Sequence, residues 1–127
     1  MINLKTIVEQ IYNRSDMPQV AGDDLGDAYK LMKENGIPVE VVTELPKNLK
    51  HSQKQINKSK VKSIIIDKRA GKKMPPLVIS KDNWIVDGHH RKVAYMVEDP
   101  NEEKTMIKIG YPRDKAIGIY KKVENKL

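Results

Sequence analysis

Side chains that could bind or transfer a phosphate gather in one stretch of the sequence. Trp84–Ala94 is typical of a short apolar strand, an Asp-Gly break and the first turns of a helix that begins with two histidines. The first backbone N–H groups of a helix have no internal partner, and the helix dipole adds partial positive charge there. A glycine in such a turn lets a ligand approach the backbone closely, and an arginine offers a planar set of donors. The stretch therefore predicts a phosphate-binding turn formed by Gly88, His89, His90 and Arg91.

The same turn holds groups that could do acid–base or metal chemistry. A carboxylate beside a phosphate, here Asp87, can hold a metal ion, orient a nucleophile or cap the helix. His89 and His90 can gain a proton near neutral pH. We therefore predict Asp87, His89 and His90 as catalytic residues and Asp87 as a ligand of Mg²⁺. The structural alternative, an Asp-Gly turn that only caps a helix, stays open at this point.

A zinc site is a weaker alternative. It would use Asp87, His89 and His90 together with the distant His51. Adjacent histidines point about 100° apart on a helix, so they are poorly placed to chelate one ion. The sequence has no cysteine, which excludes disulfides, thiol nucleophiles and cysteine-ligated zinc.

Length and charge limit the classes of protein to which this chain can belong. Its 127 residues fit one domain, and with 39% hydrophobic residues it can bury a modest core. Phe is absent, so Ile, Val, Leu and Met must build that core. The net charge of +7 favours anionic partners such as nucleotides or nucleic acid. No apolar run approaches the ~20 residues of a membrane helix, and the N-terminus lacks the apolar region of a signal peptide, so we expect a cytoplasmic protein.

Hydrophobic periodicity predicts helices and strands in one chain, an α+β fold. The expected helices are 3–14, 23–35, 59–70, 89–98 and 112–123, and the expected strands are 39–43, 77–79, 84–86 and 105–109. Ser59 is the expected cap of the helix over 59–70. In the helix over 89–98, the spacing puts His90, Val93, Ala94 and Val97 along one stripe, with Arg91 and Tyr95 on a neighbouring face. In the helix over 112–123 we expect an inward face of Ala116, Ile117, Tyr120 and Val123.

The segment Asp87-Gly88-His89-His90-Arg91, with Ala94 three residues on, resembles the signature of the ParB/sulfiredoxin superfamily. The order of elements around it is similar too: a helix, Pro75-Pro76, a strand, a short turn, a strand, the signature and a helix. This resemblance implies a small mixed sheet flanked by helices, with Arg91 in contact with a nucleotide phosphate. It predicts a division into a helical N-terminal extension over 1–36 and a compact ParB/sulfiredoxin-like domain over 37–127.

The chain also departs from its relatives at informative positions. His89 stands where sulfiredoxins have their catalytic cysteine, which excludes that activity. Partition-type ParB proteins, which use CTP, have a glutamate in the signature that this chain lacks. Gln53 matches a glutamine that the family has ahead of its first long helix, and we expect it to line the pocket. Arg14 and Gln19 lie in a loop around a Met-Pro-Gln segment that is similar to small phage-type members, and they are further candidates to line the pocket.

Three functions fit these residues. In the first, a nucleotide-binding ParB-like domain acts on DNA or nucleotides, as a nuclease or an NTP-hydrolysing enzyme with Mg²⁺. In the second, a phosphotransferase that resembles free-serine kinases moves a phosphoryl group from ATP or ADP to a small hydroxyl compound. In the third, a non-catalytic module binds a nucleotide or polyanion and regulates a partner protein. The module should tolerate Asp87→Ala but lose binding on Arg91→Ala, whereas a nuclease should need Asp87 and a divalent metal.

Overall fold

The computed structural model describes residues 24–52 and 55–127. Its elements are, in chain order, α2 (Leu25–Glu34), β1 (Val39–Glu44), the 3-10 turn η3 (Pro46–Asn48), α3 (Lys58–Arg69), β2 (Leu77–Ser80), β3 (Ile85–Asp87), α4 (His89–Glu98), β4 (Lys104–Ile109) and α5 (Arg113–Glu124). In this part of the chain no helix is both long enough and apolar enough to cross a membrane.

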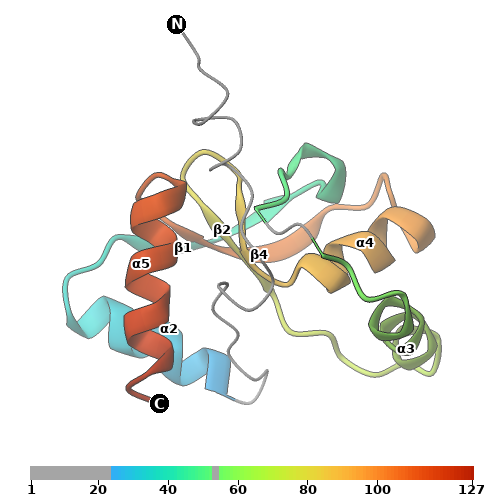
Figure 1. Ribbon diagram of the computed structural model, residues 1–127, viewed down its shortest axis with the longest axis horizontal. Coiled ribbons are helices and arrows are strands. Elements are labelled where there is room, and N and C mark those ends of the chain that lie inside the picture. The colour runs from blue at the N-terminus through green and yellow to red at the C-terminus, as the bar shows by residue number, and fades with distance from the viewer. Residues whose placement is uncertain (1–23, 53–54) are drawn as a thin grey trace, which may run out of the picture.

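The four strands of the described chain form one mixed sheet in the order β1-β4-β2-β3 (Figure 1). β1 runs antiparallel to β4, β4 runs parallel to β2, and β2 runs antiparallel to β3. A parallel pair needs a long crossover, and here β3 and α4 supply the connection between β2 and β4. β1 and β3 are therefore the edges of the sheet, and β3 leads directly into the predicted phosphate-binding turn.

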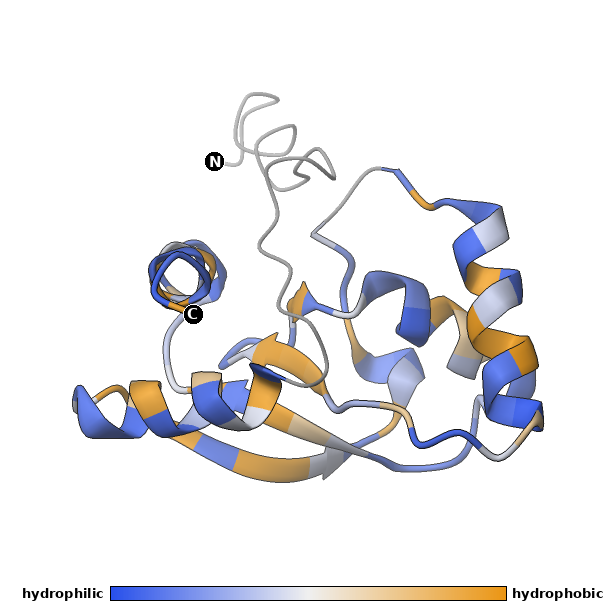
Figure 2. Ribbon diagram, turned by 90° about the horizontal axis from the view of Figure 1, so that it is seen from below, coloured by the Kyte–Doolittle hydropathy of each residue, from blue (hydrophilic) through white to orange (hydrophobic). Residues whose placement is uncertain are grey.

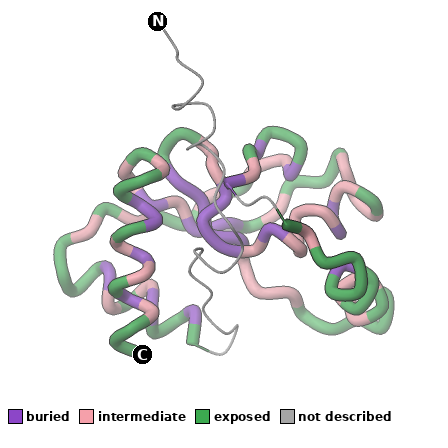
Figure 3. The backbone as a smooth tube through the Cα atoms, in the orientation of Figure 1, coloured by how far each residue is buried: buried purple, intermediate pink, exposed green. Residues whose placement is uncertain are grey.

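Successive side chains of β2 point to opposite faces of the sheet, so the core has two layers. Val78 faces α2 and α5, where it packs in a cluster with Ile107 and Tyr120. Its neighbours Leu77 and Ile79 face the other way and pack with Tyr95 of α4. Helices α2 and α5 accordingly lie together, apart from α3 and α4 (Figure 1). The strands hold much of the apolar and buried chain, whereas α3 is mostly exposed and has Val61 as its buried residue (Figures 2 and 3).

The predicted α+β class with a small mixed sheet between helices is confirmed. Each strand and helix expected from residue 23 onward is present, and its bounds agree with the expected ones to within two residues. The expected helix over 3–14 lies outside the described residues. The division into 1–36 and 37–127 stays a prediction, although α2, which falls in the first part, packs its Ala28 and Met32 into the same core cluster as α5.

One local prediction was wrong. The cap of α3 is Asn57 instead of Ser59, because the Asn57 side-chain oxygen accepts the N–H groups of Ser59 and Lys60 at 2.9 and 3.2 Å. In α4 the buried face does not follow the stripe of His90, Val93, Ala94 and Val97. His89, Ala94 and Tyr95 are the buried residues of α4.

Val97, which lies on the same stripe as Ala94, is 63% exposed. In the structure the large Tyr95 ring covers the sheet instead, and the ammonium of Lys104 lies 4.8 Å from the ring centroid.

Candidate functional site

The turn between β3 and α4 requires glycine. Gly88 is the residue before the first turn of α4 and has a φ of +105°, a backbone conformation that side chains rarely adopt. A Cβ atom at this position would clash with Cδ2 of Leu77 and would lie only 2.9 Å from Nη2 of Arg91. The turn therefore packs tightly against the start of β2 and against the guanidinium. The first N–H groups of α4 have no side-chain caps in the described chain.

The side chain of Arg91 connects this turn to the segment before β2. Its Nη2 donates a hydrogen bond to the backbone carbonyl of Pro76 at 3.2 Å, which links α4 to the segment before β2. Its Nε is buried and has no hydrogen-bond partner among the residues that the structure describes. A buried guanidinium N–H without a partner is costly. Arg91 thus holds one buried donor without an acceptor among the described residues, on a guanidinium that lies against Gly88 at the positive end of a helix.

The two histidines of the turn hold the loop ahead of α3. Nε2 of the buried His89 accepts the backbone N–H of Ser52 at 3.2 Å. Nε2 of His90 accepts the backbone N–H of Asn57 at 3.0 Å. An imidazole nitrogen that accepts a hydrogen bond is unprotonated, so both rings serve here as neutral acceptors. The histidines therefore attach Ser52 and Asn57 to the N-terminus of α4.

His51 completes a cluster of basic groups at the same place. Its ring centroid lies 5.6 Å from that of His89. Burial lowers the pKa of His89 to about 3, and the charges of His51, His90, Arg91 and Lys92 add to this effect. Burial likewise lowers the pKa of His51 to about 4, with contributions from Lys92 and His90. Neutral imidazoles therefore lie near the charged side chains of Arg91 and Lys92 around the first turn of α4.

Asp87 is the last residue of β3 and is buried. Its Oδ2 accepts a hydrogen bond from the Tyr120 hydroxyl of α5 at 3.2 Å. Burial, followed by the charge of Asp87, raises the pKa of the Tyr120 hydroxyl, so Tyr120 remains a donor. α4 has no side-chain cap within the described chain, and the capping role considered for Asp87 is not seen. Asp87 instead ties the sheet to α5.

The sequence predictions for metals and for the pocket wall fare differently. Among the described residues no three His, Asp or Glu side chains gather as a metal site would require, so His51, Asp87, His89 and His90 do not form the zinc site considered above. Magnesium at Asp87 stays a prediction. Arg14, Gln19 and Gln53 lie outside the described residues, and their place in the pocket wall also stays a prediction.

Some residues of this region were missed by sequence reasoning. Ser52 and Asn57 hold the two histidines through their backbone N–H groups, which any residue type supplies, so sequence carries no signal for them. Tyr120 was expected only as a core residue of the last helix, and its hydroxyl lies 33 positions from Asp87 in the sequence. The predicted turn residues themselves do come together, with Gly88 and Arg91 in direct contact.

Comparison with known proteins supports the fold. No protein-family model matches the chain, and no curated protein matches it. Among solved structures, the chain is similar to a Pnob8-like ParB-N domain, with a TM-score of 0.50 and 19% sequence identity. The match covers 63% of this chain and 35% of the length of that one.

At this level of identity the likeness defines the class of fold and nothing finer. The chain has a ParB-like fold, as the resemblance of its signature implied. The β3–α4 turn is the part of that fold in which the predicted phosphate-binding residues meet.

Proposed function

We propose that this chain is a ParB-like domain that binds the phosphate of a nucleotide or nucleic acid at the turn Gly88–Arg91. One observation carries the proposal: Nε of Arg91 is buried without a hydrogen-bond partner among the described residues. The guanidinium that carries this donor lies against Gly88, whose backbone conformation favours glycine. It also lies at the N-terminus of α4, which has no side-chain cap within the described chain. A phosphate oxygen supplies the acceptor that these donors need.

The charges around the turn support an anionic ligand. The charges of Lys92 and His90 help to lower the pKa of His51, and those of Arg91 and Lys92 help to lower the pKa of His89. His51 and His89 are therefore neutral near pH 7, and an anion at the turn would face the positive charges of Arg91 and Lys92. The net charge of +7 acts in the same direction, because it raises the local concentration of polyanions.

The contacts of the predicted catalytic residues favour a binding module over an enzyme. Nε2 of His89 and Nε2 of His90 already accept backbone N–H groups, so each lacks a free lone pair at that nitrogen to act as a base. Asp87 is buried and hydrogen-bonded to Tyr120. We therefore place the non-catalytic, phosphate-binding module first, ahead of a Mg²⁺-dependent nuclease or NTP-hydrolysing enzyme and of an ATP- or ADP-dependent kinase.

A thermal-shift panel tests the phosphate site. ATP, ADP, CTP, GTP, pyrophosphate and a short DNA duplex are each added with and without Mg²⁺ to the wild type, Arg91→Ala and Arg69→Ala. Arg69 is the matched control, since its side chain is 71% exposed and paired with Glu98 on another surface. A ligand at a hundred times its Kd stabilises the fold by about 2.7 kcal/mol, a shift of several degrees. We expect that shift in the wild type and Arg69→Ala and its loss in Arg91→Ala.

Two results would contradict the phosphate site. One is stabilisation by no ligand of the panel. The other is a salt-sensitive shift with DNA alone that Arg91→Ala retains, which would assign binding to the basic surface in general.

The catalytic alternatives need a second variant. Asp87→Asn keeps an oxygen that can accept the Tyr120 hydroxyl but removes the charge that would hold a metal. The module predicts that Asp87→Asn binds nucleotides as the wild type does and that neither protein consumes ATP or cleaves DNA. Mg²⁺-dependent turnover in the wild type that disappears in Asp87→Asn would establish the enzyme instead.

A further inference from the structure

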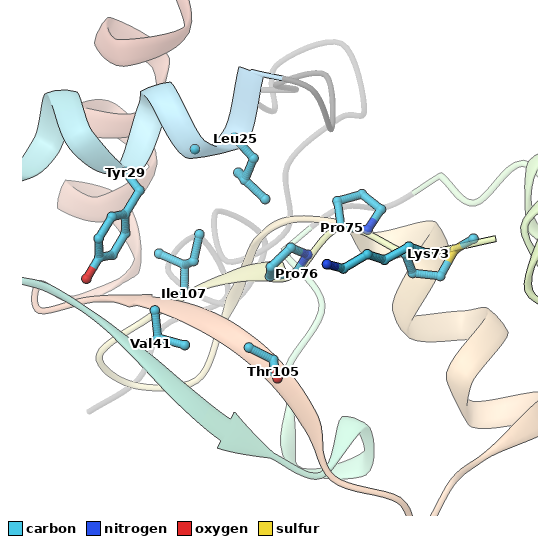
Figure 4. Close-up of a pocket in the computed structure, with 10 residues that line it drawn as sticks. Leu25, Tyr29, Val41, Lys73, Pro75, Pro76, Thr105 and Ile107 are labelled. Atoms are coloured by element: carbon cyan, nitrogen blue, oxygen red, sulfur yellow. The ribbon is translucent and has the colours of Figure 1, made fainter. Parts of the chain in front are cut away.

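A second hollow lies away from the basic cluster, between α2, the sheet and the segment before β2. It is a groove of about 620 Å³, a usual size for a small-molecule site. Its walls are lined by Leu25, Gly26, Tyr29, Val41, Lys73, Met74, Pro75, Pro76, Thr105 and Ile107 (Figure 4). Of these residues, Pro75 and Pro76 contribute to the sequence resemblance, and only as a marker of the order of elements.

The groove exists because α2 covers only part of the sheet. Val41 of β1 and Ile107 of β4 are cross-strand partners. Ile107 is 5% exposed, whereas Val41 remains 60% exposed. A β-branched apolar side chain is thus left open to solvent next to a buried one, at the point where the helix layer ends. The floor of the groove is apolar and uncovered by the described chain.

One cation points into this apolar space. The ammonium of Lys73 lies beside Pro76 over the β4 side of the groove (Figure 4). Within 24–52 and 55–127, no carboxylate pairs with Lys73, although its neighbour Lys72 pairs with Asp67 at 3.3 Å. The Thr105 side chain lies on the same floor. An apolar hollow with one unpaired cation at its side is complementary to an apolar molecule with one negative group.

We propose that this groove binds a small apolar molecule that has a single anionic group, such as a medium-chain carboxylate. Its chain would cover Val41, Ile107 and the Leu25 side of α2, and its carboxylate would meet Lys73. Pockets of this kind combine apolar walls with a few convergent polar groups, and the charge-assisted contact fixes the orientation of the ligand.

The groove and the phosphate-binding turn are separate sites with one residue in common. The ring of Pro76 lines the groove, whereas its carbonyl accepts Nη2 of Arg91. The basic residues of the turn do not line the groove. The test of the groove can therefore use substitutions that leave Gly88 and Arg91 unchanged, and its outcome is independent of the proposed phosphate binding.

Titration calorimetry with dodecanoate, below its micelle concentration, tests the proposal on the full chain. We expect 1:1 binding that Lys73→Met weakens by about tenfold or more, the value of one charge-assisted contact. Lys72→Met is the matched control for net charge and should change the affinity less than about twofold. Val41→Asp places a carboxylate on the exposed floor and should abolish binding with little change in the melting temperature.

Several results would overturn the proposal. Dodecanol binding as tightly as dodecanoate would show that no cation selects the ligand. Equal losses in Lys72→Met and Lys73→Met would show binding by overall charge. Absence of binding, with light scattering that reports a dimer or with a monomer whose groove is filled by its own chain, would assign the apolar floor to another occupant.

Discussion

The β3–α4 turn and the groove beside α2 adjoin the same proline and are built in opposite ways. At the turn, polar groups meet one another: two histidines accept backbone N–H groups, and Asp87 accepts the hydroxyl of Tyr120. In the groove, apolar side chains are left uncovered beside one lysine. A ligand at the turn would complete a hydrogen-bonding network, whereas a ligand in the groove would complete a hydrophobic layer. Substitutions at the turn should therefore lower the free energy of unfolding strongly, and substitutions on the groove floor should change it little.

The largest effect is expected at Gly88. Gly88→Val would force a β-branched residue to a φ of +105° and drive its Cβ into Leu77 and to within 2.9 Å of the Arg91 guanidinium. Backbone strain and overpacking each cost about 1–3 kcal/mol, so we expect the free energy of unfolding to fall by about 3 kcal/mol or more. Urea unfolding measures this change.

A second glycine provides a control of opposite sign. Gly118 lies within α5, and a Cβ atom added there would meet no other element of the described chain within 4 Å. Gly118→Ala should therefore stabilise the protein by about 0.5–1 kcal/mol through helix propensity alone. Equal effects of Gly88→Val and Gly118→Ala would contradict the tight turn at the start of α4.

The turn could be predicted because its parts are contiguous. A strand, a glycine and a helix start follow one another, and local backbone geometry then brings Gly88 and Arg91 together. The partners of the turn could not be predicted in the same way. Tyr120 reaches Asp87 only through the packing of α5 on the sheet, and Ser52 contacts His89 only through the path of a loop.

Acid should weaken the turn through His89. The folded-state pKa of His89 is lowered to about 3 from an ordinary value of 6.5. At a pH between these two values, the imidazole is protonated in the unfolded chain but not in the folded chain. The free energy of unfolding should therefore fall as the pH drops below about 6.5, with a slope of up to about 1.4 kcal/mol per pH unit from this group. His51 acts in the same direction.

Comparison with His89→Gln isolates this contribution. Glutamine has a side-chain oxygen that can accept the Ser52 N–H but does not titrate. Chemical denaturation at several pH values between 7.5 and 4.5 should give a shallower decline for His89→Gln than for the wild type, since carboxylates titrate equally in both. Parallel declines would mean that the folded state holds the His89 proton as readily as the unfolded chain does.

Two tyrosines offer an intermediate comparison between the regions. Tyr120→Phe removes the donor to the buried Asp87 carboxylate without changing the packing volume, and we expect a loss of about 1–3 kcal/mol in the free energy of unfolding. Tyr29→Phe removes a hydroxyl from the wall of the groove, where no hydrogen bond involves it within the described chain, and should cost less than about 0.5 kcal/mol. Matching losses would contradict the role given to Asp87.

The groove also marks the limit of what the sequence predicts about the fold. Periodicity predicts the strands and helices well, since Ala116, Ile117, Tyr120 and Val123 of α5 are all buried as expected. It does not predict how far a helix extends over a sheet. By its place in the alternating pattern of β1, Val41 could equally be a buried strand residue. It is exposed because α2 does not extend over it. No sequence motif therefore marks this hollow, which is built from α2, β1, β4 and the loop before β2.

The smallest effect is expected on the groove floor. Val41→Thr keeps the shape and the strand propensity of the side chain, and because Val41 is 60% exposed the free energy of unfolding should change by less than about 0.5 kcal/mol. Its cross-strand partner is the control: Ile107→Thr buries a hydroxyl in the core cluster and should cost about 2 kcal/mol or more. If Val41→Thr proved as costly as Ile107→Thr, the floor would be covered in solution, and the covering segment would be the ligand of the groove. If Val41→Thr leaves the free energy of unfolding nearly unchanged, the stability of the fold does not require an apolar side chain at this exposed position. That result agrees with an apolar surface that serves a ligand.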